Sequence, residues 1–63
     1  MRIVVREAKS GFEICEVDSI LDGFELIEQF ETEDKERGLF EPDFYDCIVS
    51  TEETTYTVKF ERG

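Results

Sequence analysis

The sequence predicts a single small α+β domain in the order ββαββ, with one amphipathic helix packed on a small antiparallel sheet. Three observations predict this fold. Two short runs of strand-forming residues open the chain and are joined by a glycine-containing turn. A longer segment with helical periodicity follows, and the end of the chain alternates polar and apolar residues. Because a chain of 63 residues suits one hydrophobic core, we expect residues 1–63 to form one domain.

The first two strands are expected to form a hairpin. β-Branched residues predict a strand from Arg2 to Glu7, and a second strand is expected from Phe12 to Val17. The cluster Lys9-Ser10-Gly11 between them predicts a turn in which glycine can adopt a positive φ. Apolar side chains fall on both faces of the second strand, so its pattern does not decide which face is buried.

An amphipathic helix is predicted from Ile20 to about Arg37. Ser19 precedes it as the N-cap, Asp22 follows three residues later as a variant of the capping box, and Gly38 supplies the stop. At 100° per residue, the apolar side chains form a stripe that should face the sheet. The stripe consists of Ile20, Gly23, Phe24, Ile27 and Phe30, with Leu26 at its margin.

Two further strands complete the predicted sheet. Residues Phe44 to Ser50 form the third, with Tyr45, Cys47 and Val49 on one side, and a polar turn follows at 50–54. The last strand has the clearest alternation. In it Tyr56, Val58 and Phe60 alternate with Thr55, Thr57, Lys59 and Glu61.

The charge balance excludes several classes of function. Seventeen acidic and seven basic residues give a formal net charge of -10, which argues against direct binding to nucleic acid or to an anionic membrane. The chain has no histidine, so no mechanism can use imidazole as a base or a metal ligand. No apolar run approaches the ~18 residues of a membrane span.

Two cysteines, Cys15 and Cys47, each lie in a predicted strand. We expect both to be reduced, small core residues of a cytoplasmic protein, because no signal peptide precedes them. A disulfide between them is compatible with the sequence but not required by it. Two thiols without histidine make neither a zinc site nor an activated nucleophile, so we predict no metal, no cofactor and no catalytic residue.

Acidic side chains cover the helix on the side opposite its apolar stripe. Near the helix end, Glu31 precedes Lys35 and Glu33 precedes Arg37 by four residues, which predicts two ion pairs. One interpretation of the acidic face is simple solvation. The other is mimicry of nucleic acid, in which carboxylates take the place of phosphates in a basic channel. Because the dense carboxylates wrap around the helix instead of converging, an enzyme is the least favoured class.

The aromatic segment 39–45 allows two interpretations. It either folds back on the end of the helix as part of the core, or presents aromatic side chains to a partner. Together with the exposed acids it supplies the candidate partner-binding residues. These are Glu25, Glu28, Glu36, Phe40, Asp43, Tyr45, Asp46, Glu52 and Glu53.

The segment from Asp34 to Tyr45, with the sequence DKERGLFEPDFY, follows an acidic amphipathic helix. In this respect the chain resembles small acidic accessory proteins of Firmicutes prophages and conjugative elements. The resemblance covers about half of the chain, and its motif is structural and not catalytic. It implies a mobile-element setting and a role in host interaction, including anti-restriction or anti-CRISPR inhibition, and assigns no functional residue.

The sequence therefore favours a non-enzymatic accessory protein that acts by protein–protein interaction. The alternative is an acidic nucleic-acid mimic that inhibits a DNA- or RNA-handling host enzyme. We expect a protein partner, no direct contact with nucleic acid and no membrane. A homodimer is also considered, through a free sheet edge or through the face of the sheet that the helix leaves uncovered.

Overall fold

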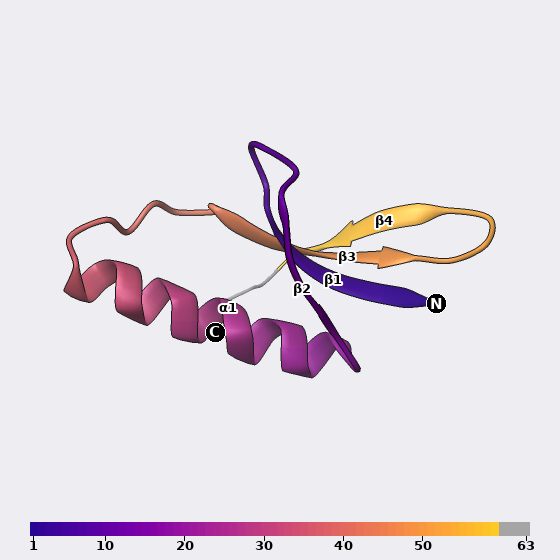
Figure 1. Ribbon diagram of the computed structural model, residues 1–63, viewed down its shortest axis with the longest axis horizontal. Coiled ribbons are helices and arrows are strands. Elements are labelled where there is room, and N and C mark those ends of the chain that lie inside the picture. The colour runs from indigo at the N-terminus through magenta and orange to yellow at the C-terminus, as the bar shows by residue number, and fades with distance from the viewer. Residues whose placement is uncertain (60–63) are drawn as a thin grey trace.

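A computed structural model describes residues 1–59 and contains one helix packed on a four-stranded antiparallel sheet (Figure 1). The predicted ββαββ order is confirmed, and the strands lie side by side in the order β2-β1-β3-β4. The central strands β1 and β3 therefore come from two different hairpins. The elements are β1 (Arg2–Glu7), β2 (Glu13–Val17), α1 (Ile20–Glu36), β3 (Tyr45–Ser50) and β4 (Thr55–Val58).

Local signals in the sequence fix both ends of α1. The Oγ atom of Ser19 accepts a hydrogen bond of 3.1 Å from the backbone N–H of Asp22. At the other end Gly38 takes a φ of 72° and donates to the carbonyl of Lys35, while the N–H of Leu39 donates to the carbonyl of Asp34. These two bonds form a Schellman motif, which requires a residue with positive φ where the glycine stands.

The core lies between α1 and the two central strands. Ile3, Val5, Cys47 and Val49 point from the sheet toward Ile27 of the helix, and all five are buried. Gly23, also buried, faces the same layer. A Cβ atom at position 23 would stand 3.0 Å from the Cys47 Sγ, so glycine allows the helix to approach β3 this closely. The rest of the predicted stripe is partly buried against this core.

A bulge in the first hairpin decides which face of β2 is buried. Val5 pairs with Cys15, but the next residue, Arg6, pairs with Glu13. Cys15 and Val17 consequently share the helix-facing side of the sheet with β1's core residues. Phe12 lies before the strand and is 63% exposed.

The face of the sheet away from α1 is covered by charged side chains. The guanidinium of Arg2 pairs with Glu13 at 3.1 Å and with Glu16 at 2.8 Å, and Arg6 pairs with Asp46 at 2.9 Å. Val4 and Ile48, the apolar residues of β1 and β3 on this face, are both buried. The uncovered face is therefore polar at its surface.

Predicted strand limits differ slightly from the structure. β2 begins at Glu13 instead of Phe12, and β3 begins at Tyr45 instead of Phe44. In both cases the displaced aromatic residue still binds the β1 segment, because the carbonyl of Phe12 accepts a hydrogen bond from the N–H of Glu7 and that of Phe44 accepts one from Ala8. The last strand spans Thr55–Val58, and the predicted strand positions Phe60 and Glu61 lie outside the described residues.

Candidate functional site

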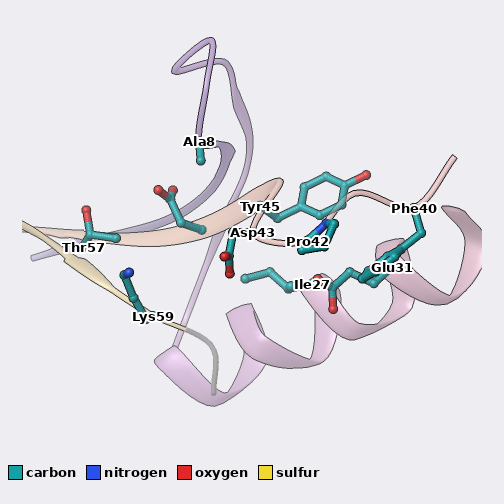
Figure 2. A pocket seen from close by; sticks show the side chains of 10 residues that line it. Ala8, Ile27, Glu31, Phe40, Pro42, Asp43, Tyr45, Thr57 and Lys59 are labelled. Atoms are coloured by element: carbon teal, nitrogen blue, oxygen red, sulfur yellow. The ribbon is translucent and has the colours of Figure 1, made fainter. Parts of the chain in front are cut away.

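A pocket of about 480 Å³ opens where the loop after α1 meets the start of β3 and the end of β4 (Figure 2). Its volume is in the range of small ligand sites in proteins. Asp43 lies between Tyr45 and Ile27, with Thr57 and Lys59 at one end of the pocket and Phe40 and Glu31 at the other. The lining residues are Ala8, Ile27, Glu31, Phe40, Pro42, Asp43, Tyr45, Asp46, Thr57 and Lys59.

A tight turn places the carboxylate of Asp43 at the pocket. The N–H of Phe44 donates to the carbonyl of Glu41 at 3.3 Å, with Pro42 and Asp43 between them. Asp43 has a φ of 58°, and the combination of proline followed by a positive φ is typical of a type II turn. The turn is tied to the first hairpin because Lys9 pairs with Glu41. Aspartate thus stands at a backbone position that glycine would adopt more easily.

Tyr45 forms a fixed aromatic wall of the pocket. Its ring packs on Phe30 at 5.3 Å and edge-on against Phe44 at 4.9 Å between centroids. Its hydroxyl donates a hydrogen bond of 2.7 Å to Oδ2 of Asp34. Burial, followed by the hydrogen bond and the negative charge of Asp34, raises the pKa of Tyr45 to about 12. The phenol is therefore neutral at pH 7.

The acidic side chains near the end of α1 do not pair as predicted. Glu31 is only 7% exposed, because it follows Gly23 and Ile27 on the buried stripe at spacings of four residues. Lys35 places its Nζ 4.8 Å from the centroid of the Phe40 ring instead of on Glu31. Glu33 and Arg37 are both exposed, and no ion pair joins them within residues 1–59.

The structure brings together four of the nine predicted partner-binding residues. Phe40, Asp43, Tyr45 and Asp46 all line the pocket, and Asp46 also pairs with Arg6. The other five lie elsewhere on the molecule. Glu25 and Glu28 are exposed on the helix, Glu36 is exposed at its last residue, and Glu52 and Glu53 are exposed in the turn between β3 and β4.

Sequence reasoning missed several pocket residues. Helical spacing from Ile27 could have identified Glu31, since the two are four positions apart on one face. Thr57 and Lys59 reach the pocket only because β4 pairs with β3, with Thr57 opposite Ile48. No local signal specifies that register. The residues that were not predicted are Ala8, Ile27, Glu31, Pro42, Thr57 and Lys59.

The exposed side of α1 forms a second surface, which is polar apart from Leu21 at its start. Its carboxylates take part in no ion pair within residues 1–59. A shallow depression runs between Glu25, Glu28 and Glu33. We call this surface the acidic helix face, and its carboxylates are Asp22, Glu25, Glu28, Glu33 and Glu36.

Both thiols are free and face the helix. They stand on opposite sides of Val5, which pairs with Cys15 on one side and Cys47 on the other. Burial, and to a smaller extent the charge of Asp46, raises the pKa of the Cys47 thiol, so this sulfur stays protonated at pH 7.

Two further structural findings concern residues 1–59. No group of three or more cysteine, aspartate or glutamate side chains in this part of the chain is arranged to hold a metal ion. Its helix is not long and apolar enough to cross a membrane.

Comparison with protein-family models, with curated proteins and with solved structures finds no match for this chain.

Proposed function

We propose that this protein acts by binding a protein partner, and that a basic side chain of the partner enters the pocket beside Asp43. The convergence of aromatic rings and carboxylates on one open pocket carries this proposal. Phe40 and Tyr45 offer apolar walls for the aliphatic part of a lysine or arginine, and Asp43 offers a carboxylate for its charged end. The surrounding negative charge would also speed the encounter with a basic partner.

The existing contacts of the pocket support a cationic ligand. The ring of Phe40 already attracts the ammonium group of Lys35, from the end of α1, at 4.8 Å, which is a favourable distance for a cation over an aromatic face. Within residues 1–59, the carboxylates of Glu31, Asp43 and Asp46 and the ammonium group of Lys59 line the pocket, and Asp46 is also paired with Arg6. Because the chain has a formal net charge of -10, an anionic ligand would meet net repulsion.

Binding without catalysis is the simpler interpretation of the chemistry. The chain supplies no imidazole, and the thiol of Cys47 is both buried and protonated. The phenol of Tyr45 is held neutral by burial and by its bond to Asp34. We accordingly propose a non-enzymatic accessory role that needs no cofactor, in a reducing cytoplasm where both cysteines stay free.

The test uses defined basic ligands. The ¹⁵N-labelled protein is titrated with short peptides containing arginine or lysine and with the same peptides in which glutamine replaces the basic residue. We expect amide shifts confined to residues 40–46 and to Lys59, only with the basic peptides. Asp43→Asn keeps the size of the side chain and should weaken binding about tenfold, since a charged hydrogen bond is lost.

Glu53→Gln is the matched control, because it makes the same chemical change in an exposed turn outside the pocket. It should bind the basic peptides as the wild type does. Binding would depend on net charge and not on the pocket if the amide shifts spread evenly over all acidic segments. The same would follow if Asp43→Asn and Glu53→Gln lost equal affinity for the basic peptides.

A second candidate function is nucleic-acid mimicry, and the acidic helix face is the observation that favours it. Five exposed carboxylates lie along one helix and none is paired within residues 1–59. Such a surface could occupy a basic nucleic-acid channel. Mimicry predicts a partner that is released at moderate salt, is displaced by DNA, and is lost in the variant Glu25→Lys/Glu28→Lys. The pocket variant Asp43→Asn would leave that binding intact.

A further inference from the structure

The two edges of the sheet differ in charge. The outer strand β2 carries Glu13 and Glu16, which are exposed, and Asp18 follows it directly. Charged side chains on an edge strand oppose pairing with another chain. The other edge, β4, is built from the uncharged residues Thr55, Tyr56, Thr57 and Val58. Only the β4 edge is therefore chemically suited to accept a further strand.

The β4 edge is also open on the helix side. Tyr56 and Val58 pair with Val49 and Cys47, so they lie on the same face of the sheet as α1. The helix packs over β1, β2 and β3 but does not reach β4, and Figure 1 shows the β3–β4 hairpin projecting beyond it. Tyr56 is consequently 49% exposed. Within residues 1–59, no strand pairs with the outer side of β4.

We propose that β4 pairs with β4 of a second copy of this chain to form a symmetric antiparallel homodimer with one continuous sheet. A two-fold axis perpendicular to the sheet keeps the two helices on the same side. Residues that face each other must then share a face of the sheet. With Tyr56 opposite its own symmetry mate, Thr55 faces Thr57, and the apolar rings of the two tyrosines meet.

Charge complementarity selects this register. It places Lys59 of each copy at the turn between β3 and β4 of the other, where Glu52 and Glu53 are exposed. Two hydrogen bonds between Thr51 and Thr54 hold the turn rigid. The Oγ1 atom of Thr51 accepts a hydrogen bond of 3.1 Å from the N–H of Thr54, and the N–H of Thr51 donates one of 2.7 Å to the carbonyl of Thr54. Each dimer would thus gain two symmetric contacts between an ammonium and a pair of carboxylates. Because β4 has only four residues, we expect a dissociation constant in the range of about 1–100 μM.

The experiment measures molar mass by sedimentation velocity over a range of protein concentrations at low salt. The wild type should change from monomer to dimer, and Lys59→Glu should raise the dissociation constant about tenfold or more, since two attractions become repulsions. Arg37→Glu is the matched control. It makes the same charge change on an exposed residue far from β4 and should leave the dimer intact. Asp43→Asn should also dimerise normally, which separates this proposal from the pocket function.

A mixing experiment tests the register directly. Glu52→Lys/Glu53→Lys should raise the dissociation constant as Lys59→Glu does, because each variant places like charges opposite each other in its own dimer. Mixed together, the two variants have opposite charges at both contacts and should form a heterodimer. A wild type that stays monomeric up to about 1 mM would overturn the dimer. The proposed pairing would be overturned if the mixture were no more associated than its components. It would also be overturned if Lys59→Glu and Arg37→Glu weakened the dimer equally.

Discussion

Gly23 and Tyr45 show how single side chains determine the packing between α1 and the sheet. Gly23 lets the helix approach β3, where even a methyl group would touch the sulfur of Cys47. Tyr45 joins β3 to the far end of the same helix through its hydrogen bond to Asp34. One contact requires the absence of a side chain and the other requires a particular polar group. Both can be tested by substitutions that change a single interaction.

Gly23→Ala should destabilise the protein by about 1–2 kcal/mol, despite the higher helix propensity of alanine. The new Cβ would lie 3.0 Å from the Cys47 Sγ, and Cys47 is fully buried, so the sulfur has little room to move. In the Cys47→Ala background the sulfur is gone, so the higher helix propensity of alanine should dominate. There Gly23→Ala should stabilise the protein by a few tenths to about 1 kcal/mol. Urea unfolding of the four proteins measures this coupling. Equal effects of Gly23→Ala in both backgrounds would contradict the contact.

The pKa of Tyr45 predicts a loss of stability at high pH. The folded pKa of about 12 exceeds the ordinary value of 10.0, so between these values the folded protein keeps a proton that the unfolded chain has released. Stability should therefore be complete below pH 10 and fall as the pH rises toward 12. Unfolding by denaturant at pH 8 to 12 measures this fall, and Tyr45→Phe should remove this contribution.

Absorbance titration isolates the same group. The chain has two tyrosines, so Tyr56→Phe leaves Tyr45 as the single phenol. In this variant the titration midpoint should lie near 12 and should decrease when Asp34→Asn removes the neighbouring charge. A titration midpoint near 10 that does not change with Asp34→Asn would contradict the buried, hydrogen-bonded environment of Tyr45.

At the scale of elements, the sequence predicts best what depends on neighbouring residues. Both ends of α1 follow from Ser19 and Gly38, whose capping bonds involve partners three to five positions away. The order of the strands depends on contacts between distant segments, as does the bulge after Val5 that turns Cys15 inward. The pocket depends on such contacts even more, since it joins residues from both hairpins, the helix and the loop. Thus Asp43 and Tyr45 could be proposed from sequence, whereas their neighbour Lys59 could not.

The N-cap offers a test at this scale. Ser19→Ala removes the acceptor for the N–H of Asp22 and should lower the free energy of unfolding by about 1 kcal/mol. Ser19→Asp is the matched variant, because its carboxylate can accept the same bond and also suits the positive end of the helix dipole. Thermal unfolding should rank Ser19→Asp at or above the wild type and Ser19→Ala below it. The reverse order would show that the hydroxyl has another role.

At the scale of the whole molecule, charge is distributed unevenly. The N-terminal cations Arg2, Arg6 and Lys9 each pair with a carboxylate, mostly across the open face of the sheet. The carboxylates of the acidic helix face are unpaired within residues 1–59. With a formal net charge of -10, repulsion among them opposes the compact state. The ion pairs of Arg2 are more than half exposed, so solvent screens them and they contribute little to stability.

Added salt should therefore stabilise the protein, because it screens more repulsion than attraction. We expect the melting temperature to rise by about 5 °C between 20 and 500 mM NaCl, which for a domain of this size corresponds to about 1 kcal/mol. Glu25→Gln/Glu28→Gln should raise the melting temperature at low salt and reduce its dependence on salt. Arg2→Gln, which removes a paired cation, should have the opposite effect at low salt. A melting temperature that falls with salt in the wild type would mean that the local pairs on the sheet outweigh repulsion across the acidic helix face.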